Sequence, residues 1–281
     1  MSKTKILFIN TEIVPYLDES RMANIGRFLA QGIQEAGHEI RTFMPRFGII
    51  NERRNQLHEV IRLSGMNLVI NETDHPLIIK VASMQPVRMQ IYFIDNDDYF
   101  SHRKEFADGR GLEYDDNGER AFFFACGVVE TIRKLRWNPD VIYCQGWFAA
   151  LAPIYIRKHY GDDPCFRNAK IVTALYDDAF KKSFPSNFHA TIKREGITKT
   201  DLSEIREKPV THEMLCRLAI KFSHAVIKTD EGVNPELLAY AEKMGKPVLT
   251  ATEEELNVAK YETFFDELCA APAQPATPAK K

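Results

Sequence analysis

The hydrophobic pattern at the start of the chain alternates between strand and helix. A nearly unbroken apolar run predicts a buried strand over Lys5–Asn10. Apolar residues then recur at helical spacing, which predicts a helix from about Glu19 to Glu35 that Gly37 ends. A second apolar run predicts a strand over His38–Met44. A strand, a helix and a strand in this order indicate a parallel sheet with right-handed crossovers.

The pattern then changes to short, closely spaced apolar segments. These segments predict hairpins or an insertion at the edge of the sheet. They cover Val60–Leu63, Asn67–Ile70, Leu77–Ser83 and Met89–Ile94. The polar stretch Asp95–Asp116 follows and predicts a long loop, and loops of this length are often functional.

The remaining residues return to the alternation of helices and strands. Helices are expected over Asn117–Leu135, Trp147–His159, Val210–Phe222, Pro235–Lys243 and about Glu253–Leu268. Strands are expected over Asp140–Cys144, Lys170–Leu175, Ala225–Lys228 and Pro247–Leu249. The pattern therefore predicts an α/β fold built on a doubly wound parallel sheet. We expect one domain over residues 1–269 and a disordered tail over residues 270–281, because the tail has no apolar pattern.

Composition narrows the class of protein. The chain has 281 residues, of which 44% are hydrophobic, enough for one large α/β domain. The formal net charge of −2 argues against nucleic acid or an anionic membrane as the main partner. No apolar run approaches the roughly 18 residues that span a bilayer, and no signal peptide is evident. The five scattered cysteines form no C-x-x-C pair, which indicates reduced thiols in a cytoplasmic protein.

Several other chemistries find no support in the sequence. No Walker A, G-x-G-x-x-G or G-x-S-x-G motif is present. His58 and His75 lack metal-ligand spacing with any other His or Cys. We therefore expect neither a cofactor nor a bound metal.

Five segments in chain order resemble the N-terminal domain of bacterial glycogen synthases and plant starch synthases, glycosyltransferase family 5. They lie within Lys5–Glu12, Gly37–Gly48, Tyr92–Phe100, Asp115–Arg120 and Pro139–Pro153. The resemblance covers roughly residues 5–180 and implies a Rossmann-like domain, one half of the two-domain GT-B architecture. In that family the second half holds most of the donor nucleotide, and 281 residues are too few for both halves.

The family transfers glucose from ADP-glucose, or sometimes UDP-glucose, to the end of an α-1,4-glucan without a metal. The resemblance implies substrate-binding roles for four residues that match the family pattern, Glu12, Asn96, Tyr99 and Trp147. Gln145 falls on the position of a family histidine. Its amide can hydrogen-bond a sugar hydroxyl but cannot shuttle a proton, so the catalytic residue is unknown.

Other positions depart from the family pattern. Asp18 falls on the diphosphate-binding lysine, Asn24 on an acidic residue, Gly146 on an aspartate and Tyr176-Asp177 on a His-Asn pair. Two unit charges about 4 Å apart interact by roughly 4 kcal/mol at an effective dielectric of 20, so the charge reversal at Asp18 is costly for a diphosphate. The basic stretch Lys181–Lys199 offers another phosphate grip, or is a solvated loop.

The matching residues also have structural interpretations. Glu12 can cap the first turn, and Asn96 ends a strand, where such residues often bond their own backbone. Glu119 and Arg120 open a helix, where capping and intrahelical roles are common. Trp147 can stack on a sugar ring or belong to the core. The sequence leaves these alternatives open.

Two main classes of function follow. In the first, the chain is a glucosyltransferase, or one half of it with a separate chain supplying the donor domain. In the second, it is a pseudoenzyme that binds glucan or scaffolds glycogen metabolism, and a pure interaction module is a third class. The departures at Asp18, Gln145 and Tyr176 lead us to expect that the chain alone does not turn over.

Overall fold

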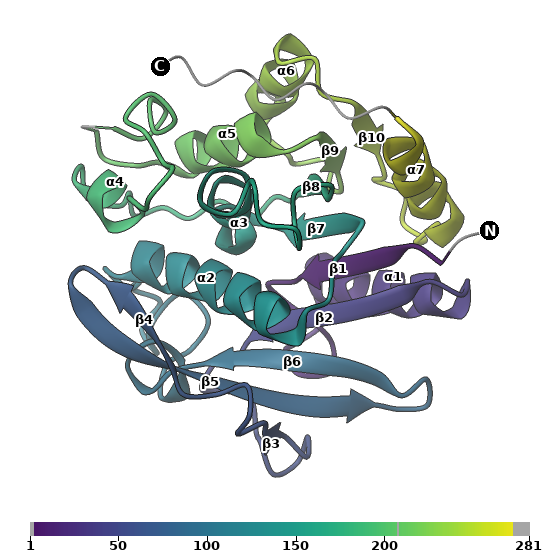
Figure 1. Cartoon of the computed structure of the whole chain (residues 1–281), viewed down its shortest axis with the longest axis horizontal. Helices are drawn as coiled ribbons and strands as arrows, with labels where there is room; N and C mark the ends of the chain where they lie inside the picture. The colour runs from purple at the N-terminus through teal and green to yellow at the C-terminus, as the bar shows by residue number, and fades with distance from the viewer. Residues whose placement is uncertain (1–2, 207, 272–281) are drawn as a thin grey trace.

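The computed structural model describes residues 3–206 and 208–271 as a twisted sheet with helices on both faces (Figure 1). The strands are β1 (Lys5–Ile9), β2 (Glu39–Pro45), β3 (His58–Glu59), β4 (Met66–Ile70), β5 (Thr73–Met84), β6 (Met89–Asp95), β7 (Val141–Gln145), β8 (Lys170–Leu175), β9 (Ala225–Lys228) and β10 (Val248–Thr250). The helices are α1 (Arg21–Glu35), α2 (Asn117–Leu135), α3 (Ala152–Ile154), α4 (Phe188–Thr191), α5 (His212–Phe222), α6 (Pro235–Lys243) and α7 (Val258–Ala270).

The strand order confirms the predicted doubly wound α/β fold. The sheet runs β10-β9-β8-β7-β1-β2-β6-β5-β3, and its path from β10 to β6 is parallel throughout. Strands β5, β3 and β4 add an antiparallel wing at one edge, as the closely spaced segments predict. The chain leaves β1 toward β2 and later returns to the other side of β1 at β7. The switch point of the topology therefore lies between β1 and β7.

Helices cover the two faces of the sheet in separate layers. Helix α2 packs against α3, α3 packs against α5, and α5 packs against α6, so these helices form one layer. Helices α1 and α7 pack together on the other face (Figure 1). Because the central strands are covered on both sides, their residues are apolar almost without interruption.

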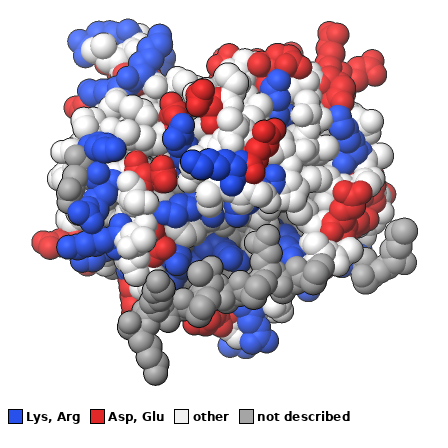
Figure 2. All heavy atoms as spheres, turned by 90° about the horizontal axis from the view of Figure 1, so that it is seen from above, with Lys and Arg blue, Asp and Glu red and all other residues white. Residues whose placement is uncertain are grey.

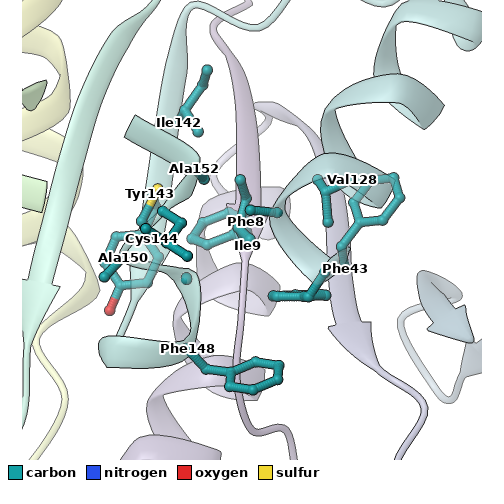
Figure 3. Close-up of a cluster of buried hydrophobic side chains, with 14 of the residues drawn as sticks. Phe8, Ile9, Phe43, Val128, Ile142, Tyr143, Cys144, Phe148, Ala150 and Ala152 are labelled. Atoms are coloured by element: carbon teal, nitrogen blue, oxygen red, sulfur yellow. The ribbon is translucent and has the colours of Figure 1, made fainter. Parts of the chain in front are cut away.

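The close-up in Figure 3 shows the core around the central strands. Phe8 of β1 lies against Tyr143 of β7, with ring centroids 5.5 Å apart. Phe43 of β2 and Phe148 project into the same region, and both are fully buried. Burial of large side chains such as these contributes about 1.5–3 kcal/mol each, which makes the three central strands a stable base for the loops at their ends.

Helix α1 begins and ends with specific capping interactions. The Ser20 side chain accepts a hydrogen bond from the backbone N–H of Ala23, so the helix begins at Arg21 rather than at the predicted Glu19. At the other end Gly37 has a φ of +100° and donates its N–H to Gln34, while His38 donates to Ile33. This pair of bonds is a Schellman motif, which confirms the predicted glycine stop.

Three predicted elements differ in the structure. The strand expected at Val60–Leu63 is wrong, because the ladder uses His58–Glu59 and the following residues form a turn. The helix expected over Trp147–His159 is broken into a 3-10 turn, the short α3 and a π-helical turn, with Pro153 at the start of α3. The last helix begins late, at Val258, where the Asn257 side chain caps it.

Further expectations concern the C-terminal tail, membrane-spanning helices and the cysteines. The tail that we expect to be disordered falls, from residue 272 onward, outside the described residues. In the part of the chain that the structure describes, no helix has the length and apolar character needed to cross a membrane. The five cysteines are unpaired, and four of them are buried.

One buried cation holds the long loop in place. Arg120 is completely buried at the start of α2, and its guanidinium donates to the carbonyl oxygens of Tyr99, Lys104 and Glu105 at 2.7–3.0 Å. It also donates to Asn117 Oδ1 at 2.7 Å. Burial lowers the pKa of Arg120 to about 10. The charge therefore stays in the interior because the loop backbone surrounds it with carbonyl dipoles.

We expect Arg120→Ala to lower the unfolding free energy by about 3–5 kcal/mol, because it leaves several buried carbonyls without a donor. Urea unfolding followed by circular dichroism measures this loss. The matched control is Arg110→Ala on the same loop, whose side chain is 79% exposed and which should leave the midpoint nearly unchanged. A similar small effect of both substitutions would contradict the anchoring role of Arg120.

Candidate functional site

A cavity of about 440 Å³ opens at the carboxyl edge of the sheet, over the switch point between β1 and β7. Its walls come from the turn after β1, the ends of β7, β8 and β9, and Phe106 of the long loop. In open α/β sheets, ligands bind in this crevice outside the carboxyl ends of the strands. We call this cavity the cleft.

Gln145, at the end of β7, does not line the cleft but is hydrogen-bonded to the turn after β1. Its Oε1 accepts the backbone N–H groups of Thr11 and Glu12 at 3.0 and 3.1 Å. Its Nε2 donates to the carbonyl of Met22 at 3.0 Å, with Tyr176 Oη 3.5 Å away. The side chain is fully buried and its amide is used by the protein on both sides. The structure therefore gives Gln145 a positioning role, and its predicted contact with a sugar hydroxyl would require these bonds to be exchanged.

Glu12 lies in the wall of the cleft, and its substrate-binding role stays a prediction. Its carboxylate accepts a 2.6 Å hydrogen bond from Ser20 Oγ, the residue that also caps α1. Burial raises the pKa of Glu12, and the carboxylates of Glu105 and Asp178 add to this effect. A Cβ at Gly26 would lie 2.1 Å from the Glu12 carbonyl, so only glycine allows α1 to approach this turn.

Further carboxylates line the cleft from β8 and β9. Asp177 and Asp178 follow β8, and Asp230 follows β9. Burial raises the pKa of Asp230. Among the described residues, Arg21 is the one cation of the lining, and its Nε and Nη2 donate to the carbonyls of Thr229, Ala251 and Glu253. The cleft is therefore predominantly acidic.

Trp147 also reaches the cleft, but most of it belongs to the core. Its side chain is only 3% exposed and contacts the rings of Phe106 and Phe180, each with centroids 5.0 Å away. The backbone N–H of Trp147 donates to Asp178 Oδ2 at 2.8 Å. The core interpretation of this residue is supported, and the edge that borders the cleft is small.

An aspartate–histidine pair beside the cleft was not predicted. His212, the first residue of α5, lies with its Nε2 3.0 Å from Asp178 Oδ1. A Cβ at Gly146 would lie 2.5 Å from Asp178 Oδ2, so the glycine at a family aspartate position makes room for this carboxylate. Such a pair can hold or move a proton. Asp178 and His212 are 34 residues apart and belong to no known motif. The pair therefore could not be predicted from the sequence.

Asn96 and Tyr99 do not line the cleft. The Asn96 side chain caps a π-helical turn, Asp97–Ser101, by accepting the N–H groups of Asp98 and Tyr99, and it donates to the Pro76 carbonyl. This is the backbone-bonding role that the sequence left open. The substrate contacts predicted for Asn96 and Tyr99 remain predictions. In the structure both residues lie just after the end of β6.

Tyr99 belongs to a separate buried network. Its hydroxyl lies 3.2 Å from His75 Nε2 and donates to Glu119 at 3.2 Å. Burial raises the pKa of Tyr99 well above its ordinary value. The second carboxylate oxygen of Glu119 accepts a bond from Asn71 at the tip of the β4–β5 hairpin. The network therefore ties the edge wing to the start of α2.

The other positions that the sequence analysis singled out lie on the surface, in the core or on a bonded loop. Asp18 is exposed on the turn before α1, and Tyr176 is buried with its hydroxyl 2.9 Å from that of Tyr143. The backbone N–H groups of Lys181 and Lys182, from the basic stretch, are bonded to Glu113. Across residues 3–206 and 208–271, no group of three or more His, Cys, Asp or Glu side chains has the arrangement of a metal site.

Comparison with known proteins yields one consistent set. The family model of the starch synthase catalytic domain matches residues 5–249. Glycogen synthase of Chlorobaculum parvum is 34% identical over 202 residues, which are 68% of this chain and 41% of that protein. Glycogen synthase of Pelodictyon phaeoclathratiforme is 30% identical over 230 residues, 75% of this chain and 47% of that protein. The chain thus spans less than half the length of these curated relatives.

A solved structure shares the fold. The catalytic domain of starch synthase IV from Arabidopsis thaliana, bound to ADP and acarbose, superimposes with a TM-score of 0.72 at 14% sequence identity. The match covers 89% of this chain and 51% of that one. The doubly wound sheet therefore corresponds to about half of a GT-B catalytic domain.

We expect Glu12→Gln to be more stable than the wild type at neutral pH, with a difference that shrinks as the pH falls. The folded-state pKa of Glu12 is raised, so the wild type gains stability as the pH drops through that value toward the ordinary 4.5. Urea unfolding of both proteins between pH 8 and pH 5 measures the trend. The exposed Glu255→Gln serves as the control. A difference that grows on acidification would contradict the buried, disfavoured charge.

Proposed function

Because the chain belongs to the starch synthase catalytic domain family, we propose that it engages an α-glucan in the cleft and does not by itself transfer glucose from a sugar nucleotide. It carries a glycogen/starch-synthase-like glycosyltransferase domain, which the family match supports over residues 5–249. The identity of the ligand and the lack of turnover are our proposal, and they rest on the lining of the cleft.

The observation that carries the proposal is the chemistry of this lining. Glu12, Asp177, Asp178 and Asp230 place carboxylate oxygens around the cavity, and Phe106 adds an aromatic ring. Carboxylates accept hydrogen bonds from hydroxyl groups, and aromatic rings pack on the apolar faces of sugars. This combination suits a neutral polyhydroxylated ligand such as a glucan.

The same lining is unfavourable for a diphosphate. A phosphate group binds best where backbone N–H groups and cations face it. Here Arg21 is already bonded to backbone carbonyls, and Asp18 replaces the lysine of the family turn. A carboxylate about 4 Å from a phosphate oxygen would repel it by roughly 4 kcal/mol at an effective dielectric of 20.

The ligands of one protein with this fold support a sugar-binding role. The Arabidopsis starch synthase IV domain is bound to ADP and to acarbose. For this chain we propose the glucan role alone, with Glu12 and Asp177 as contacts and Gln145 as the residue that positions Glu12. Transfer from ADP-glucose would require a diphosphate grip from elsewhere, such as a separate chain supplying the second GT-B half.

Binding is tested by affinity electrophoresis of the purified chain in gels that contain glycogen. We expect retardation by glycogen, and an affinity about fivefold weaker for Asp177→Ala, because one net hydrogen bond to a hydroxyl is worth about 1 kcal/mol. The matched control is Glu35→Ala, an exposed carboxylate at the opposite end of α1. Equal retardation of all three proteins would show that glycogen binds outside the cleft. If glycogen retards none of them, the interaction-module class is favoured.

Turnover is tested by incorporation of labelled glucose from ADP-glucose, and in parallel UDP-glucose, into glycogen. We expect no incorporation above a heat-killed control, because the diphosphate finds carboxylates where the family offers a lysine. Activity that survives rigorous purification and disappears in Glu12→Ala would overturn this part of the proposal. Activity that appears only with an added protein would identify the partner half.

A further inference from the structure

Four basic side chains meet at the amino edge of the sheet, opposite the cleft. Lys170 begins β8, His224 precedes β9, and Lys246 precedes β10. Arg157 reaches them from the π-helical turn after α3, with its Nη1 3.1 Å from His224 Nε2. We call these residues the basic edge cluster.

The hydrogen bonds of His224 define which ring nitrogen carries a proton. His224 Nδ1 lies 2.8 Å from the backbone nitrogen of Ile171 and accepts its N–H, because that backbone group can only donate. In the neutral ring Nε2 therefore carries the hydrogen. Nε2 and the Arg157 guanidinium then face each other as two donors, and the described residues place no acceptor between them. An oxyanion oxygen beside them would accept from both.

The cluster also lacks a counter-charge. Within the described residues, Arg157, Lys170 and Lys246 form no ion pair with a carboxylate, although the neighbouring Lys158 pairs with Asp201 at 2.8 Å. Burial lowers the pKa of His224 to about 3, and the charges of the three cations contribute further. The cluster is thus a region of uncompensated positive charge.

A simpler explanation accounts for part of this arrangement. Lys246 Nζ donates to the carbonyl of Ser223 at the end of α5, and Lys170 Nζ donates to the carbonyl of Ala271 after α7. Cations at helix ends complement the helix dipole. This role does not explain Arg157 and the Nε2–H of His224, for which the described residues provide no carbonyl or carboxylate acceptor.

We propose that the basic edge cluster binds a phosphate-class oxyanion, with Arg157 and the Nε2–H of His224 as hydrogen-bond donors and with Lys170 and Lys246 supplying charge. A dianion would offset most of the positive charge, and a tetrahedral group has enough oxygens for several donors. Figure 2 looks down on the side that carries α5 and α6 and shows Lys and Arg side chains interspersed with Asp and Glu over this face. The ligand can be inorganic phosphate or a phosphate ester, and the site is independent of the cleft.

The proposal is tested by titrating the chain with inorganic phosphate at constant ionic strength while the His224 imidazole is followed by NMR. We expect saturable shifts of the His224 ring signals, because the bound anion accepts the hydrogen on Nε2. Arg157→Ala should weaken phosphate binding about tenfold, the effect of losing one charge-assisted hydrogen bond. The control is Lys193→Ala, an exposed lysine of the basic stretch, which should bind like the wild type.

The alternatives give distinct results. A second titration with phenyl phosphate distinguishes inorganic phosphate from a phosphate ester as the ligand. If phenyl phosphate competes with inorganic phosphate at similar affinity, the site accepts esters; if it does not compete, the site takes inorganic phosphate alone. Equal effects of chloride and phosphate at matched ionic strength would overturn the proposal and leave the cations as complements of the helix ends. Binding that Arg157→Ala leaves unchanged while Lys193→Ala abolishes it would place the anion on the basic stretch instead. Far-ultraviolet circular dichroism and the urea midpoint serve as the fold controls for every variant, so the result does not depend on glucan binding.

Discussion

The architecture of the cleft depends on the amide of Gln145. This side chain joins the end of β7 to the turn after β1, the two segments that flank the switch point of the sheet. By holding the N–H groups of Thr11 and Glu12, it defines the path of the turn and brings the Glu12 carboxylate into the wall of the cleft. The same amide reaches Met22 in the first turn of α1. Gln145 stands where the family has a histidine, and in this chain it holds the backbone of the turn after β1.

Much of the fold follows from hydrophobic periodicity, and the failures have local causes. The central strands and α2 are predicted closely because their apolar faces are long and their ends carry clear breakers. The helix expected over Trp147–His159 fails because packing of its aromatic residues and Pro153 outweighs helical periodicity. For the cleft, family resemblance points to Glu12 and Trp147, whereas the Asp178–His212 pair arises only from tertiary packing. Asn96 matches the family pattern, but its side chain caps the turn that follows it and does not reach the cleft.

Charge placement links the two functional arguments. The carboxyl edge of the sheet carries the acidic residues Glu12, Asp177 and Asp230, while the amino edge carries Arg157, Lys170 and Lys246. A net charge of −2 conceals this separation. The edge at which related folds bind phosphates is therefore predominantly acidic in this chain, and the basic residues named here lie on the opposite edge. Electrostatics of this kind affects ligand choice without altering the fold.

The central position of β1 also has a consequence for how the protein is made. β1 pairs with β7, and Lys5 bonds to Asp140 across 135 residues of sequence. Contacts so distant in sequence form late, since the entropy of closing the loop must be overcome first. During synthesis, β1, α1 and β2 can assemble early, but the turn that carries Glu12 lacks its Gln145 anchor until that residue has left the ribosome. Until then the backbone N–H and C=O groups of β1 that will pair with β7 are unpaired, and an unpaired strand edge can bind other chains.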